Sequence, residues 1–145
     1  MSKVRERMED AKLGRQTSIF SPAFYTHRHG YKLLVRLCLN GSGEGQSSHL
    51  SAFLVLAKGD FDALLPWPLR RKCTFTLLDQ SEARAHICDS FATSSGAFLQ
   101  RPTRELNVAS GLPLFCPLAA LSECGRYVAE NTLFFRAVVA EEPSN

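Results

Sequence analysis

The chain has 145 residues, of which 45% are hydrophobic and 21% charged, with a formal net charge of +3. This composition fits one globular domain with a single core, and the spread of its positive residues argues against nucleic-acid binding. No apolar run reaches the roughly 18 residues of a membrane span, so we expect no membrane insertion, and five cysteines without a signal peptide predict reduced thiols in the cytosol.

Residues 1–18 are predicted to be a lead-in with the only expected helix. They are rich in good helix formers, Val4, Met8 and Ala11 recur at helical spacing, and Gly14 provides a stop. One stripe of three apolar residues is far too short for a trimerising coiled coil. We therefore expect a short helix or loop packed at the edge of the domain.

The first clear strand is expected over residues 32–39. Four aliphatic side chains share one of its faces at period two: Leu33, Val35, Leu37 and Leu39. Arg36 and Cys38 then fall on the opposite, wetter face. A guanidinium on a rigid strand suits carboxylates or carbonyls of a partner, although Arg36 could equally be an ordinary surface arginine. Three glycines between residues 41 and 45 predict a hairpin loop after this strand.

Further strands are expected wherever short runs alternate in hydrophobicity: 50–58, 73–79, 86–91, 108–114 and 132–140. Short strands at this spacing with almost no helix predict an all-β fold, an antiparallel β-sandwich of about seven to eight strands over residues 19–140. Residues 141–145 are expected to be a disordered tail. Between strands, residues 64–68 contain two prolines and cannot be helical. Trp67 there is either a packing anchor or a ligand-stacking ring.

Few residues suggest chemistry. Cys88 lies two residues from His86 and could form a thiol–imidazole pair, but no motif of a cysteine protease surrounds it. His27 and His29 could approach one metal ion, yet no paired zinc-ligand spacing occurs. We therefore expect no enzyme activity, no metal and no cofactor.

Six ordered stretches carry a family resemblance: SPAFYTHRHGYK, HLSAFLVLAKGDFDALLPWPL, TFTLLDQ, FLQRP, NVASGLPLFCPL and YVAENTLFFRAVV. They resemble the C-terminal domain of the TNF-receptor-associated factors, a branch of the MATH fold, over roughly residues 14–140, and are most similar to the type 1 and type 2 members. That domain normally opens with a short Trp-containing strand, and we expect this chain to lack it. A truncated sheet would expose an unpaired edge.

The resemblance implies a groove for extended receptor tails of the Pro-x-Gln-x-Thr/Ser type. The strand with Ser110 and Gly111 would pair with the peptide backbone, and Arg36 would meet an acidic side chain. Gly43 would allow the backbone to approach. The hydroxyls of Ser94 and Ser95 would hold the glutamine amide, and Gly96 stands where the family has a third serine. Three phenylalanines would form apolar walls of the groove: Phe53, Phe91 and Phe98.

Two departures from the family pattern predict altered or weakened specificity. Cys38 stands where the family typically has a tyrosine, and Ser42 stands where it has an aspartate. Each change removes a polar group from the implied groove.

The implied function is a cytosolic signalling adaptor that receptors recruit to the inner face of the plasma membrane. Its partners would be cytoplasmic tails of TNF-receptor-superfamily proteins and related adaptors, and its outputs NF-κB and kinase signalling and apoptosis. The family assembles as homo- or hetero-trimers, but without the coiled coil we expect a monomer or weak trimer. Three alternatives stay open: a MATH-type substrate-recognition module for ubiquitin machinery, a thiol enzyme, and a degenerate domain acting as decoy or assembly element.

Overall fold

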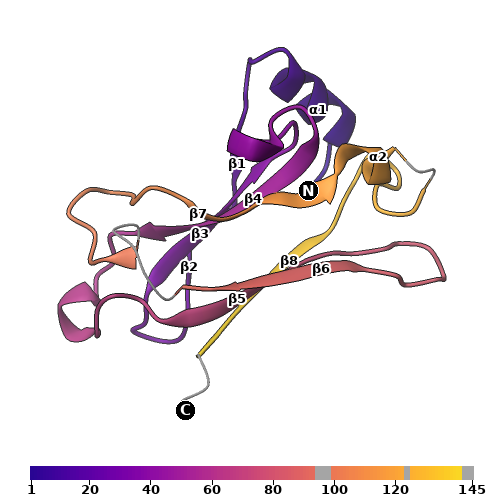
Figure 1. Cartoon of the computed structure of the whole chain (residues 1–145). Helices are drawn as coiled ribbons and strands as arrows, with labels where there is room; N and C mark the ends of the chain where they lie inside the picture. The colour runs from indigo at the N-terminus through magenta and orange to yellow at the C-terminus, as the bar shows by residue number, and fades with distance from the viewer. Residues whose placement is uncertain (94–98, 123–124, 142–145) are drawn as a thin grey trace.

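Residues 1–93, 99–122 and 125–141 are described by a computed structural model. They form eight strands in two antiparallel sheets, with a helix beside one of them (Figure 1). The larger sheet runs β1-β3-β4-β7, and β2 also pairs with β3. Its strands are β1 (Ile19–Phe20), β2 (Phe24–Tyr25), β3 (Lys32–Cys38), β4 (His49–Ala57) and β7 (Ser110–Pro117).

The smaller sheet has the order β6-β5-β8. Its strands are β6 (Ile87–Ala92), β5 (Arg71–Leu77) and β8 (Phe135–Glu141). The predicted antiparallel sandwich is therefore confirmed. Strand bounds differ from the prediction by a few residues, most at β7, because Val108 precedes the strand and is 67% exposed.

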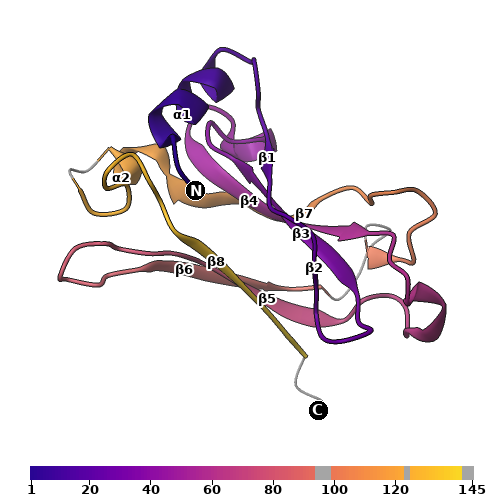
Figure 2. The ribbon, with the colours of Figure 1, turned by 180° about the vertical axis from the view of Figure 1, so that it is seen from behind.

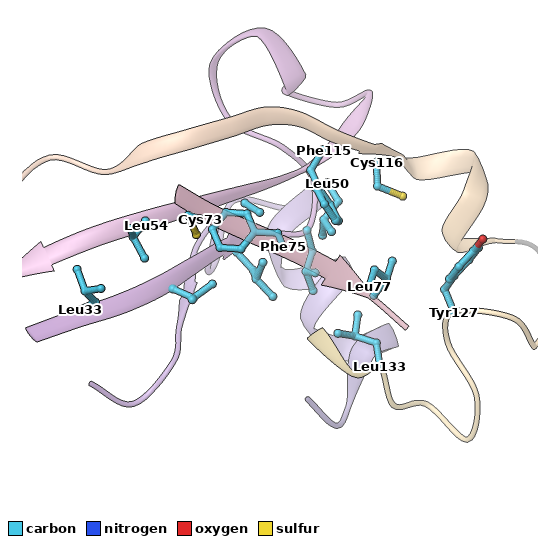
Figure 3. Close-up of a cluster of buried hydrophobic side chains, with 14 of the residues drawn as sticks. Leu33, Leu50, Leu54, Cys73, Phe75, Leu77, Phe115, Cys116, Tyr127 and Leu133 are labelled. Carbon is cyan, nitrogen blue, oxygen red and sulfur yellow. The ribbon is translucent and has the colours of Figure 1, made fainter. Parts of the chain in front are cut away.

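The core lies between the two sheets and is built from the side chains that share the inner faces (Figure 3). All four aliphatic residues of the predicted inner face are buried: Leu33, Val35, Leu37 and Leu39. Phe75 of β5 is fully buried, and its ring centroid lies 5.6 Å from that of Phe91 and 5.3 Å from that of Phe135. These two tilted contacts lie within the smaller sheet, whereas the contact of Phe75 with Phe115 of β7, with ring centroids 6.4 Å apart, joins it to the larger sheet.

The helix α1 (Val4–Lys12) packs on the domain as a short single element. Val4 and Ala11 are buried, and Gly14 follows the helix with a φ of +75°, where glycine avoids the steric penalty of other residues. Met1 exchanges two backbone hydrogen bonds with Leu133, of 2.7 and 2.9 Å. The predicted short helix is confirmed, and it is fastened to the segment that leads into β8.

Three short helical turns were not predicted: η1 (Gly43–Gly45), η2 (Asp62–Leu64) and α2 (Leu118–Leu121). The prediction that residues 64–68 contain no helix was wrong at one residue, because Leu64 is the last residue of η2. Each turn has three or four residues and so shows no helical periodicity in the sequence. Trp67 is a packing anchor, because its Nε1 donates to the Asp62 carbonyl at 2.8 Å and its ring meets Tyr31 edge-on at 5.0 Å.

The loop between β5 and β6 is organised around the buried carboxylate of Asp79. It accepts hydrogen bonds from the Ser81 hydroxyl at 2.6 Å, from Arg126 Nη2 at 2.9 Å and from the Ala85 backbone at 2.9 Å. These donors, the Ser81 hydroxyl and the Arg126 guanidinium first, hold the pKa of Asp79 well below its usual range. The carboxylate therefore ties this loop to the segment before β8.

Candidate functional site

One row of residues crosses the outer face of the larger sheet and ends at its edge. Arg36 of β3 lies opposite Phe53 of β4, and Phe53 lies opposite Gly111 of β7. The Arg36 guanidinium carbon is 5.5 Å from the Phe53 ring centroid, a cation–π distance. β7 is the last strand of this sheet, so within the described part of the chain its far edge has no strand partner. The row therefore links a fixed cation to an open strand edge.

Arg36 is oriented by a residue from outside the strand. Its Nε donates to the Ser18 hydroxyl at 2.7 Å, and the same Ser18 oxygen lies 3.6 Å from Cys38 Sγ. Cys38 is only 1% exposed, so the expectation that it shares a wet face with Arg36 was wrong. Cys38 ends β3, and the segment with Ser18 covers it there. The thiol therefore contacts the Ser18 hydroxyl and is almost completely shielded from solvent.

A shallow cavity of about 270 Å³ lies beside Arg36. Most of its other lining residues are apolar and come from three separate segments: Phe20, Val55, Leu106, Val108 and Ala109. Phe20, Leu106 and Val108 are exposed. Exposed apolar side chains around a cation are typical of recognition surfaces. This grouping could not be predicted from the sequence, because no motif joins segments so far apart.

Gly111 is required by the close approach of β7 to β4. An added Cβ would lie 2.6 Å from the Ala52 oxygen and 2.9 Å from Phe53 Cα, both rigid backbone atoms. A glycine within a strand often marks a close approach by another backbone, and here the approaching backbone is that of β4.

A buried hydroxyl fastens the loop before β4 to β7. Between the pairs Leu50↔Cys116 and Ala52↔Leu112 the register shifts, leaving Ser51 opposite the bulged residues that include Pro113. The Ser51 hydroxyl donates to the Pro113 carbonyl at 2.7 Å and accepts the Ser42 backbone N–H at 2.9 Å. Ser42 is thus held through its backbone. Beside it, an added Cβ at Gly43 would meet nothing within 4 Å.

The smaller sheet contributes Phe91 of β6, a strand that is in contact with β7. Phe91 is half-buried and packs on Phe75, so part of its ring belongs to the core. Ser94, Ser95, Gly96 and Phe98 lie outside the described residues. The two residues that flank this segment, Thr93 and Leu99, both contact Leu69. Thr93 Oγ1 donates to the Leu69 carbonyl at 3.1 Å, and the Leu69 N–H donates to the Leu99 carbonyl at 2.8 Å.

The other chemical candidates have separate partners. His86 Nδ1 accepts the Asp79 backbone N–H at 2.8 Å, whereas Cys88 Sγ accepts from the Thr76 hydroxyl at 3.4 Å, so they form no thiol–imidazole pair. His29 packs its ring on Phe61, with centroids 4.7 Å apart. Across residues 1–93, 99–122 and 125–141, no three His, Cys, Asp or Glu side chains gather as metal ligands would. No helix there is long and apolar enough to cross a membrane.

These features define a β-sandwich with a basic and aromatic row at a free strand edge. The family model of the TRAF/meprin MATH domain matches residues 16–136, and the chain belongs to this family. The resemblance inferred from the sequence is thereby confirmed.

The chain is similar to several TNF receptor-associated factors. TNF receptor-associated factor 1 of Mus musculus is 50% identical over 141 residues, which cover 96% of this chain and 34% of that protein. TNF receptor-associated factor 2 of Homo sapiens is 45% identical over 96% of this chain and 28% of that protein. The solved structure of Notothenia coriiceps TRAF5 matches with a TM-score of 0.94 and 39% identity, over 100% of this chain and 72% of that one. The chain thus spans about a third of the length of its curated relatives.

Proposed function

We propose that this chain is the receptor-binding domain of a signalling adaptor, and that it takes extended cytoplasmic tails of TNF-receptor-type proteins along the free edge of β7. The carrying observation is the row from Arg36 through Phe53 to Gly111, which ends at that edge. An added strand gains affinity from main-chain hydrogen bonds and specificity from pockets for alternate side chains. Homology to the TNF receptor-associated factors supports the same assignment.

Each side chain of the site contacts a different part of the peptide. Arg36 binds an acidic side chain, since Ser18 occupies only its Nε. Phe53 and Phe91 supply apolar walls, and Gly43 leaves room for the peptide backbone. The glutamine amide of a Pro-x-Gln-x-Thr/Ser tail is assigned to the hydroxyls of Ser94 and Ser95, with Gly96 in place of a third serine and Phe98 as a third apolar wall.

The affinity of this site is expected to be weakened or retuned. Cys38 is buried against Ser18, and Ser42 is engaged through its backbone N–H, so neither supplies the phenol or carboxylate that the family resemblance implies. A hydrogen bond to a charged group contributes about 1.5–3 kcal/mol. With about 1.4 kcal/mol for each tenfold step in Kd, two losses would shift a micromolar site by orders of magnitude.

The cellular role that follows is that of a non-catalytic adaptor in the cytosol, brought to the inner face of the plasma membrane by its receptors. Such an adaptor would act in NF-κB and kinase signalling and in apoptosis. Clustered receptors compensate for weak single contacts when the adaptor is a trimer, because linked sites gain avidity. This chain alone is expected to be a monomer or a weak trimer.

Calorimetric titration with a Pro-x-Gln-x-Thr receptor peptide, beside its Gln→Ala control, tests the proposal. We expect binding at hundreds of micromolar that the Gln→Ala peptide lacks. Arg36→Glu should weaken binding about tenfold or more, the equivalent of about 1.4 kcal/mol. Arg5→Glu, an exposed arginine on α1, serves as the matched control and should change nothing. Unchanged binding by Arg36→Glu would refute the assignment of this groove.

A further inference from the structure

The hollow of about 270 Å³ beside Arg36 has large apolar walls that none of the contacts assigned to the receptor-tail groove uses. Phe20 is 47%, Leu106 42% and Val108 67% exposed. Val55 of β4 also lines the hollow, and it is only 2% exposed, so it forms the floor. Exposed apolar side chains that group around a buried one are typical of a surface that binds a ligand.

Backbone hydrogen bonds hold the walls of the hollow in place. The Lys58 N–H donates to the Glu105 carbonyl at 2.9 Å. The Asn107 N–H donates to the Leu56 carbonyl at the same distance, so residues 105–109 lie along the end of β4. In Figure 2 they belong to the orange loop on the right that leads into β7. On the opposite side of the hollow, the pairing of β1 with β3 fixes Phe20. A preformed pocket of this kind binds a side chain at a low cost in ordering.

The lining of the hollow combines one cation with apolar side chains. Arg36 is the only charged residue among the described residues that line it. An acidic side chain is therefore favoured at Arg36, whereas the part of the hollow over Val55 favours an uncharged apolar side chain. The two positions select two different residues of one ligand.

The register of the strands sets the spacing between these two positions. Arg36 lies opposite Phe53, and Leu34 lies opposite Val55, so the two rows are two residues apart on the outer face of the sheet. Every strand pair among the described residues is antiparallel. A receptor tail added to β7 in the same sense would run from the end of β7 toward its start. It would therefore pass the Phe53 row first and the Val55 row two residues later.

We propose that the receptor tails of this chain carry a large aliphatic or aromatic side chain two residues after the acidic residue, and that this side chain enters the hollow between Phe20 and Val108. The inference rests on the receptor-tail groove proposed above and adds a position that selects among tails. Side chains at i and i+2 share one face of a strand, so the acidic side chain at Arg36 and the apolar one over Val55 bind together. The apolar contact would offset part of the affinity that the two departures from the family pattern remove.

The test is calorimetric titration of the full chain with three capped peptides of equal length. They are Pro-Ala-Gln-Glu-Thr-Leu-Ala, Pro-Ala-Gln-Glu-Thr-Ala-Leu and Pro-Ala-Gln-Glu-Thr-Ala-Ala. Only the first places leucine two residues after the glutamate. We expect it to bind about five- to tenfold more tightly than the third, because the hollow buries part of the leucine side chain. The second should bind like the third, because its leucine lies on the opposite face of the strand.

Variants of the chain locate the contact. Val108→Ser should bring the Kd values of the first and third peptides close to each other, because it removes one apolar wall of the hollow. The matched control is Leu13→Ser, which replaces a similarly exposed aliphatic residue at the end of α1. It should leave the ratio of the two Kd values as it is in the parent chain.

The outcomes separate this inference from the groove on which it rests. Absence of binding by all three peptides would overturn both. Equal binding by the three peptides, with a Gln→Ala version still weaker, would overturn the apolar position alone, and so would equal tightening by the two leucine peptides. A parent chain that is dimeric, that Val108→Ser makes monomeric and that shows no preference among the peptides would assign the hollow to a second copy and overturn the inference.

Discussion

The hydroxyl of Ser51 offers a direct test of how the loop before β4 is held against β7. Ser51 is fully buried, and it bridges the Ser42 N–H and the Pro113 carbonyl at the register shift between β4 and β7. Ser51→Ala removes both hydrogen bonds at once. Because Pro113 has no N–H and sits at a bulge, the strand ladder cannot compensate at this point.

The cost of Ser51→Ala follows from this geometry. Each neutral hydrogen bond contributes about 0.5–1.5 kcal/mol, and a buried group left without a partner costs about 1–3 kcal/mol. We therefore expect the free energy of unfolding to fall by about 2–3 kcal/mol. With a urea slope of about 2 kcal/mol/M, the midpoint should drop by about 1 M or more.

Urea unfolding followed by the fluorescence of Trp67, the single tryptophan, measures this difference. Ser48→Ala is the matched control, since the Ser48 hydroxyl also contacts two groups, the Gly45 carbonyl and His49, but is exposed. It should change the free energy of unfolding by less than about 0.5 kcal/mol. If the two variants were equally stable, Ser51 would not be fastening the loop to β7.

Three further predictions test the scaffold around the site. Gly111→Ala should lower the free energy of unfolding by about 1–3 kcal/mol, because the added methyl group would clash with the β4 backbone. Gly14→Ala should lower it less, because that position carries only the cost of its positive φ. Thermal melts of the two variants measure the difference. Because the pKa of Asp79 is depressed in the folded chain, its ionised carboxylate stabilises the fold fully above about pH 4, and this stabilisation is lost as the pH falls toward the folded pKa. The difference in free energy of unfolding between the parent chain and Asp79→Asn should therefore narrow in acid. A difference of constant size from about pH 7 to about pH 3 would contradict this. Burial raises the pKa of Cys73 to about 12 and of Cys116 to about 11, so mass spectrometry should find both unalkylated in the native chain at pH 8 and modified only in urea.

The sheets were predictable because their signal is local. Alternation at period two placed Leu33 and Val35 on the inner face of β3, and it set Arg36 on the opposite side of this strand from the aliphatic residues. The same alternation assigned Cys38 to a wet face, which was wrong because burial there depends on the segment containing Ser18. The partners of Arg36 could not be read from its neighbours for the same reason. Contacts between segments distant in the chain leave no periodic trace.

The Ser18 hydroxyl gives this chain a distinct way of orienting Arg36. The family resemblance implies a phenol at position 38, whereas here Cys38 is buried and the hydroxyl beside Arg36 comes from Ser18. Ser18→Ala should leave stability within about 1 kcal/mol, because Arg36 is partly exposed and water can replace the lost acceptor. It should weaken an acidic receptor peptide roughly three- to tenfold, the cost of about 0.5–1.5 kcal/mol for ordering a freed side chain. Calorimetry should find that Ser18→Thr, which keeps a hydroxyl, binds the acidic peptide as tightly as the parent chain does. It should also find that Ser18→Ala and the parent chain bind equally a peptide whose acidic residue is replaced by alanine. Equal weakening of both peptides would mean that Ser18 acts through the fold and not through Arg36.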